Sequence, residues 1–132
     1  MIKNKNICII DNQDAVFGNI AYDLASLIDD VRLKTSANFK QNVFEEYIKK
    51  NKKINIENFK NDFEILSVLR NLKIIGIFTR LSMRDNKKTY LKLIPYAWKL
   101  IEQRTEKNEK FIELRIILDK YFPKKLRNKY AN

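Results

Sequence analysis

Apolar side chains recur along this 132-residue chain mainly at the spacing of amphipathic helices. The exception is a short continuous apolar run, Ile7 to Ile10, which lies between polar residues and predicts a buried strand. Helical periodicity then predicts three helices, from Ile20 to about Val31, from a cap at Ser36 to about Lys50, and from Ile56 to about Met83.

Two prolines divide the C-terminal part of the chain. The segment from Tyr90 to Ile94 is predicted to be helical up to Pro95, which fits the first turn of a new helix because it lacks a backbone N–H. A last helix is predicted from about Asn108 to Tyr121 and is expected to stop at Pro123. One short N-terminal strand, or a hairpin remnant, followed by helices predicts a mainly α fold. A lone strand would still need a hydrogen-bonding partner.

Composition agrees with a helical domain. The chain has only two Gly and two Pro, and 45% of its residues are apolar, so one domain over residues 1–132 can bury a core. The periodicity predicts inward-facing side chains in each helix. The main ones are Ile20, Leu24, Leu27, Ile28 and Val31; Phe39, Val43, Phe44, Tyr47 and Ile48; Phe59, Phe63, Leu66, Leu69, Leu72 and Ile75; and Phe111, Leu114, Ile117 and Leu118.

The net charge of +11 raises the question of a polyanionic partner. Basic runs such as "KKNKK" (Lys49 to Lys53) and "PKKLRNKY" (Pro123 to Tyr130) are spread along the chain and do not gather on one helix face. No zinc-ligand spacing, aromatic RNA-binding strand or helix-turn-helix signal accompanies them. We therefore favour compositional drift and solubility over a nucleic-acid partner, with a basic helical nucleic-acid-binding module as the alternative.

Cysteine and histidine counts narrow the chemistry further. A single cysteine, Cys8, excludes an internal disulfide and fits a reducing compartment. The chain has no histidine, which removes the commonest general base and argues against a zinc site. The start "MIKNKN" lacks the apolar core of a signal peptide, and no apolar run approaches the ~20 residues of a membrane span. These features predict a cytoplasmic protein without a membrane partner.

Three carboxylates stand out against the basic composition. Asp11 and Asp14 follow the apolar run in one polar turn, where paired carboxylates suit an oxygen-seeking cation such as Mg²⁺. On spacing alone, ordinary turn chemistry is the simpler interpretation of the same residues, because Asp favours turns. Asp23 lies inside a predicted helix, either partly buried and hydrogen-bonded to a packed loop or on a solvated helix turn.

Two further groups offer binding alternatives. Arg80 and Arg84 lie one helical turn apart and suit a polar ligand, although a solvated helix end is the simpler interpretation. Trp98, Tyr96 and Tyr90 offer aromatic anchors for a protein-interaction module, although aromatic residues at helical spacing more often belong to a core.

Longer motifs carry a family resemblance. "IIDNQDAVFGNIAYDLASLIDD" resembles the strand-to-loop segment and following helix of aminoglycoside-phosphotransferase-like, protein-kinase-like small-molecule kinases. The segments "NLKIIGIFTRLSMRDNKKTYL", "IPYAWKLIE" and "ELRIILDKYFP" follow in the expected order and are similar to bacterial cell-wall amino-sugar kinases, which phosphorylate N-acetylmuramate and N-acetylglucosamine. The resemblance covers nearly the whole chain.

The resemblance implies roles for the three acids. Asp11 matches the acid that holds Mg²⁺ against the nucleotide phosphates in protein-kinase-like enzymes. Asp14 matches an acid of the same loop, whose role stays open, and Asp23 matches a helix residue that supports the catalytic loop. This chain departs from the family pattern at Asn12, where an aromatic residue is common, and at Asn19, where proline is common.

The resemblance also implies missing parts. A Gly-rich loop, a phosphate-binding lysine and a histidine-containing catalytic loop normally precede the metal-binding acid, whereas only ten residues precede Asp11. We therefore expect a helical C-terminal lobe of an ATP-dependent sugar or amino-sugar phosphotransferase, inactive alone and binding neither ATP nor Mg²⁺ by itself. Such a chain is a gene relic or one piece of a split enzyme with a separately encoded N-terminal half. The substrate-binding residues stay unassigned.

Overall fold

Helices make up nearly all regular structure in the computed structural model, which describes residues 2–3, 6–7, 17–106 and 108–130. The predicted mainly α fold is therefore confirmed. In chain order the elements, with η marking 3₁₀ helices, are β1 (Ile2–Lys3), β2 (Asn6–Ile7), α1 (Ala21–Ile28), α2 (Ala37–Lys50), α3 (Ile56–Arg84), η1 (Lys88–Leu93), α4 (Ile94–Thr105), η2 (Glu109–Phe111), α5 (Ile112–Tyr121) and α6 (Lys124–Arg127).

The N-terminal strand has a partner. Strands β1 and β2 pair in antiparallel register, with Ile2 opposite Ile7 and Lys3 opposite Asn6. This pairing agrees with the hairpin alternative of the predicted fold, because β1 supplies a hydrogen-bonding partner from residues ahead of the apolar run. Residues 8–10 of the predicted strand lie outside the described residues.

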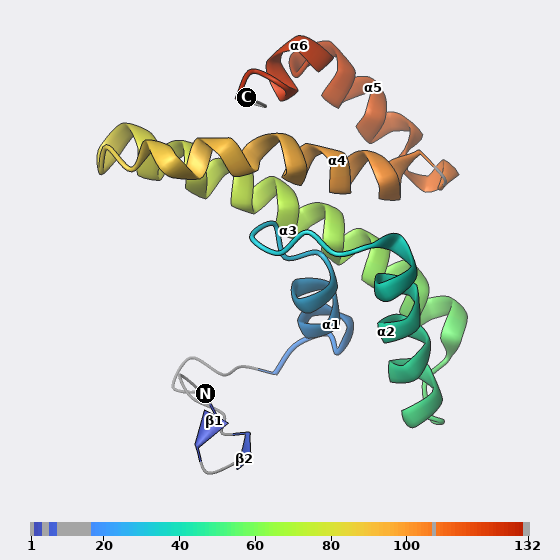
Figure 1. Cartoon of the computed structure of the whole chain (residues 1–132). Coiled ribbons are helices and arrows are strands. Elements are labelled where there is room, and N and C mark those ends of the chain that lie inside the picture. Colours follow the sequence, from blue (N-terminus) through green and yellow to red (C-terminus); the bar gives the residue numbers. More distant parts are fainter. Residues whose placement is uncertain (1, 4–5, 8–16, 107, 131–132) are drawn as a thin grey trace.

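Helix α3 is the axis of the helical bundle. It is 29 residues long, and Figure 1 shows α1 and α2 against its N-terminal half and α4 crossing its C-terminal half. Helices α5 and α6 lie on the other side of α4 (Figure 1). Although α3 is long, neither it nor any other helix in the described part of the chain is apolar enough over sufficient length to cross a bilayer.

Two hydrophobic clusters lie along α3. The first joins α3 to α1 and α2, and the second joins α3 to α4, η1 and α5, so that one helix contributes to both cores. The buried members are Ala21, Leu24, Ala25, Ile28, Phe59 and Phe63 in the first cluster, and Val31, Val68, Ile74, Phe78, Ile94, Ala97, Trp98, Leu100, Ile101, Phe111 and Leu118 in the second.

Local capping residues set the helix starts. Ser36 Oγ accepts a hydrogen bond from the Phe39 amide at 3.1 Å, and Asn55 Oδ1 accepts one from the Asn58 amide at 3.0 Å. Pro95 lies in the first turn of α4. The predicted starts of α2, α3 and α4 are confirmed because each depends on chemistry within one helical turn.

Several predicted inward-facing side chains instead face solvent. They are Ile20, Leu27, Phe39, Leu69 and Ile117. Helix α1 ends at Ile28, sooner than predicted. It buries the face that carries its two alanines, and Leu27 therefore lies on the side that faces solvent. The 3.6-residue period locates an apolar stripe, but neighbouring helices decide which edge of that stripe is covered.

Arg127 holds the unpredicted helix α6 in place. Its guanidinium donates to the Phe122 carbonyl at 2.6 Å, to Glu102 at 2.8 Å and to Asp119 at 2.5 Å. It also lies over the Trp98 ring, 5.0 Å from the centroid. Trp98 is only 4% exposed, so the interpretation of this residue as an exposed docking anchor is wrong.

We predict that the second cluster carries much of the stability. Leu100 is 1% exposed, and Leu100→Ala should reduce the free energy of unfolding by about 2 to 5 kcal/mol because it leaves a cavity between packed helices. Urea denaturation followed by circular dichroism measures the change. Leu27→Ala is the matched control, and since Leu27 is 69% exposed it should change stability by about 0.5 kcal/mol or less. Equal losses in the two variants would contradict this packing.

Candidate functional site

Two predicted site acids lie outside the described residues. These are Asp11 and Asp14, and the same holds for Asn12, the first departure from the family pattern. Their predicted roles therefore remain predictions. The described chain resumes at Phe17 and enters α1 at Ala21, so the structure shows how the segment after these acids is attached.

Asp23 lies on the exposed side of the first turn of α1. A carboxylate at this position interacts favourably with the positive end of the helix dipole. Among the described residues it makes no hydrogen bond, which agrees with the interpretation as a solvated helix turn. Its predicted support of a catalytic loop concerns a segment beyond the described residues and stays a prediction.

Asn19 ties the start of α1 to α3. Its Oδ1 accepts from the Ala21 amide at 2.9 Å, and its Nδ2 donates to Asp62 Oδ2 at 2.7 Å. The backbone carbonyl of Asn19 also accepts from the Tyr22 amide at 3.0 Å. The Asn19 side chain thus satisfies a backbone amide at the start of α1 and adds a link to α3 that proline could not make.

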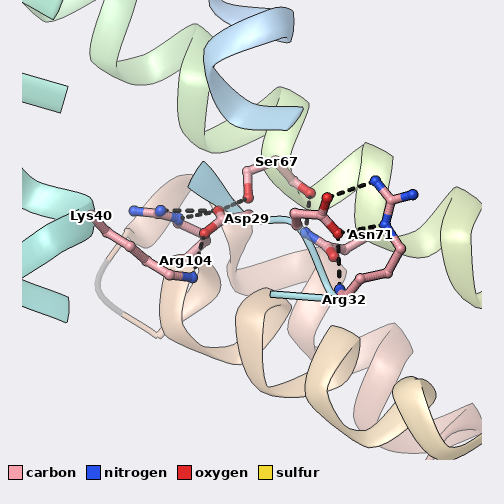
Figure 2. Close-up of polar contacts among 7 residues, drawn as sticks. Asp29, Arg32, Lys40, Ser67, Asn71 and Arg104 are labelled. Carbon is pink, nitrogen blue, oxygen red and sulfur yellow. Dashed lines mark hydrogen bonds and ion pairs between the residues drawn. The ribbon is translucent and has the colours of Figure 1, made fainter. Parts of the chain in front are cut away.

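Asp29 ties the other end of α1 to three helices. Its carboxylate accepts from Ser67 Oγ of α3 at 2.6 Å, from Lys40 Nζ of α2 at 3.0 Å, and from Arg104 of α4 through Nε at 3.2 Å and Nη2 at 3.0 Å. Figure 2 shows Lys40 and Arg104 converging on this carboxylate. Asp29 is fully buried, so these bonds replace the water that an ionised carboxylate would otherwise require.

Opposing effects act on the pKa of Asp29. Burial is the largest and would by itself raise the pKa, because it disfavours the charged form. The positive charges of Arg104 and Lys40 and the hydrogen bond from Ser67 together outweigh it and hold the pKa below the ordinary value. Asp29 is therefore ionised at neutral pH and forms a buried ion cluster.

Sequence reasoning missed this cluster. Asp29 and Asp30 are adjacent residues of one type, yet Asp30 is partly exposed and pairs with Arg32 at 2.7 Å. Arg32 is drawn beside the buried cluster in Figure 2. The only local signal was that Asp29 lies one position beyond the buried Ile28. Its partners come from three other helices, which no local pattern identifies.

The remaining predicted binding groups are solvated. Arg80 is exposed, and Arg84 forms an exposed pair with Asp85 through bonds of 2.7 and 2.9 Å. This agrees with the interpretation as a solvated helix end. Within the described ranges, no group of three or more Asp, Glu or Cys side chains is close enough together to hold a metal ion.

We predict that Asp29→Asn destabilises the bundle by about 3 kcal/mol, because it leaves two mostly buried cations without their counterion. The matched control is Asp30→Asn, one residue away. Its Arg32 partner is 71% exposed and screened by water, so we expect a loss below about 1 kcal/mol. Urea denaturation of both variants measures the difference, and a larger loss for Asp30→Asn would contradict the assignment.

The lowered pKa of Asp29 also predicts a pH dependence. Because the folded-state pKa lies below the ordinary 3.8, the ionised carboxylate contributes stability above that value and loses it as pH falls through the folded-state pKa. The stability difference between the unmodified chain and Asp29→Asn should stay constant from pH 7 to about 5 and then shrink below pH 3.8. A difference that already shrinks between pH 7 and 5 would exclude this ionisation.

Comparison with known proteins finds four curated relatives, all described as N-acetylmuramate/N-acetylglucosamine kinases. The protein from Caulobacter vibrioides is 30% identical over 87% of this chain and 31% of its own length. The protein from Neisseria meningitidis is 36% identical over 66% of this chain and 28% of its own length. The protein from Pseudomonas aeruginosa is 29% identical over 86% of this chain and 36% of its own length.

The chain therefore spans about a third of the length of the curated relatives it matches. No family model and no solved structure matches it. The relatives nevertheless carry the name that the sequence motifs predict, and the match extends over most of the chain. The resemblance to amino-sugar kinases is thus confirmed: most of this chain is similar to about a third of the length of bacterial N-acetylmuramate/N-acetylglucosamine kinases.

Proposed function

We propose that this chain forms the helical part of an ATP-dependent phosphotransferase that acts on a hydroxyl group of an amino sugar. The observation that carries the proposal is the match to four proteins named as kinases of two amino sugars, three of them matched over more than four fifths of this chain. The predicted C-terminal lobe of a protein-kinase-like fold follows from the same relationship. The helical structure is compatible with that assignment.

We further propose that the chain is inactive alone. Phosphoryl transfer depends on positioning and on charge stabilisation by a nucleotide cradle, a catalytic base and metal ligands. The curated relatives are about three times as long as the stretch that this chain matches. The parts that the relatives have outside the matched stretch would supply these groups, and ATP and Mg²⁺ would bind only in the completed enzyme.

Within the completed enzyme, Asp11 is proposed as the magnesium ligand. When bound, Mg²⁺ would neutralise negative charge on the phosphates of the nucleotide. Asp14 belongs to the same segment and keeps an open role, and Asp23 is proposed to support the catalytic loop. What the described residues contribute is attachment, because Asn19 and Asp29 hold the two ends of α1 against α3.

A chimera tests this assignment. In it, this chain replaces the matched segment of the Caulobacter vibrioides relative, and ATP-dependent phosphorylation of N-acetylglucosamine and N-acetylmuramate is measured. We expect turnover by the chimera and none by the isolated chain. Asp11→Asn in the chimera should lower kcat by at least about a hundredfold, because the charge that faces the phosphates is lost.

Asp30→Asn is the control for this experiment, since it makes the same change at an exposed ion pair and should leave turnover unchanged. Circular dichroism confirms that each variant is folded. A folded chimera without turnover would overturn the proposed function. Turnover by the highly purified isolated chain, abolished by Asp11→Asn, would overturn the proposal that the chain is inactive alone.

A further inference from the structure

A cavity of about 640 Å³ lies beside the buried ion cluster, within the size range of small-molecule sites. Residues of α1, α2, α3 and α4 line it, so it lies where the bundle's N-terminal and C-terminal halves meet. Both cations of the cluster, Lys40 and Arg104, are part of its wall. The other lining residues used below are Phe44, Lys60, Phe63, Glu64, Tyr96, Lys99 and Glu106.

The ion cluster carries an excess positive charge. Two cations share the single carboxylate of Asp29, and their side chains are only 11% and 24% exposed. Arg104 uses Nε and Nη2 on this carboxylate and leaves Nη1 without a protein partner among the described residues. Lys40 uses one of its three protons. Unused charged donors therefore remain at the cavity wall.

The nearby acids do not neutralise the excess positive charge of Lys40 and Arg104. Glu64 accepts a hydrogen bond from Asn108 at 2.6 Å, and Glu106 is exposed. In the described part of the chain neither acid forms an ion pair with Lys40 or Arg104. Lys60 and Lys99 add two cations to the lining, so that the wall together with Asp29 carries one net positive charge. One anionic group on a ligand would neutralise it.

Aromatic rings form the apolar part of the cavity. Phe44 and Phe63 meet edge to face at 5.0 Å, and Tyr96 also lines the space. The Arg104 guanidinium lies over the Phe63 ring at 4.8 Å, and the Lys40 ammonium lies over the Tyr96 ring at 5.6 Å. Each cation is thus held by a ring and by Asp29, which fixes the donors before any ligand arrives.

We propose that this cavity binds a ring-sized organic monoanion, whose carboxylate accepts hydrogen bonds from Arg104 Nη1 and Lys40 Nζ while its ring packs on the aromatic wall. Arg and Lys donors suit a carboxylate, and preorganised donors reduce the entropy lost on binding. The choice of a sugar acid as the ring rests on the proposed function. N-acetylmuramate carries a carboxylate and N-acetylglucosamine does not, so the two sugars form a matched pair of probes.

The test titrates the full chain with each sugar and follows backbone amide chemical shifts by NMR. We expect N-acetylmuramate to bind at least about tenfold more tightly than N-acetylglucosamine, with the shifts concentrated at the cavity residues of α2 and α4. The preference should weaken as salt is raised, because part of it is an attraction between charges. Equal affinities, or shifts confined to residues away from the cavity, would overturn the proposal.

A pair of variants on α2 sharpens the result. Lys40→Gln removes the excess charge but leaves Arg104 and Ser67 on Asp29, and it should abolish the preference for N-acetylmuramate. Lys50→Gln makes the same charge change at the exposed end of the same helix and should preserve the preference. Circular dichroism establishes that both variants are folded, and the comparison of the two sugars on the unmodified chain needs no variant.

The outcomes for the cavity and for the proposed function are separable. An active chimera together with equal affinities for the two sugars would overturn the cavity proposal alone. A folded but inactive chimera together with a charge-dependent preference for N-acetylmuramate would overturn the proposed function alone. The titration of the isolated chain uses neither ATP nor Mg²⁺, so its result does not depend on turnover.

Discussion

The ionised carboxylate of Asp29 is the interaction on which the arrangement of the helices depends. It lies at the end of α1 and binds side chains from α2, α3 and α4, so it connects parts of the chain up to 75 residues apart. A fully buried charge is tolerated only when it is paired and hydrogen-bonded. The Asp29 carboxylate can therefore be buried only if α2, α3 and α4 bring Lys40, Ser67 and Arg104 to it. The packing of α1 against these three helices thus depends on all of these contacts together.

Much of the fold could be predicted because its causes are local. Ser36 and Asn55 cap their helices within one turn, and Pro95 marks a helix start because of its own covalent structure. The covered edge of α1 and the presence of α6 could not be predicted in the same way. Leu27 faces solvent because of where α3 lies, and α6 depends on the distant partners of Arg127.

The residues of the candidate site also differ in whether sequence motifs or tertiary contacts identify them. The roles of Asp11 and Asp14 came from a resemblance to whole motifs, since their spacing alone fits a turn as well as a metal site. The resemblance to amino-sugar kinases is confirmed, while these two roles remain predictions. The role of Asp29 was not predicted because Asp30 is chemically identical and adjacent. Only the tertiary structure separates the buried carboxylate of Asp29 from the partly exposed one of Asp30. The residue type alone does not show which of the two aspartates is buried.

The composition of the ion cluster also bears on ligand binding. Holding α1 in place requires one cation for the Asp29 carboxylate, and a second mostly buried cation adds a desolvation penalty without a second counterion. Arrangements that cost stability in this way are typical of functional sites, where charge is positioned in advance for a ligand. An anion bound in the cavity would offset the penalty and stabilise the folded chain in proportion to its occupancy. The carboxylate that organises the helices therefore also determines the charge that the cavity presents to a ligand.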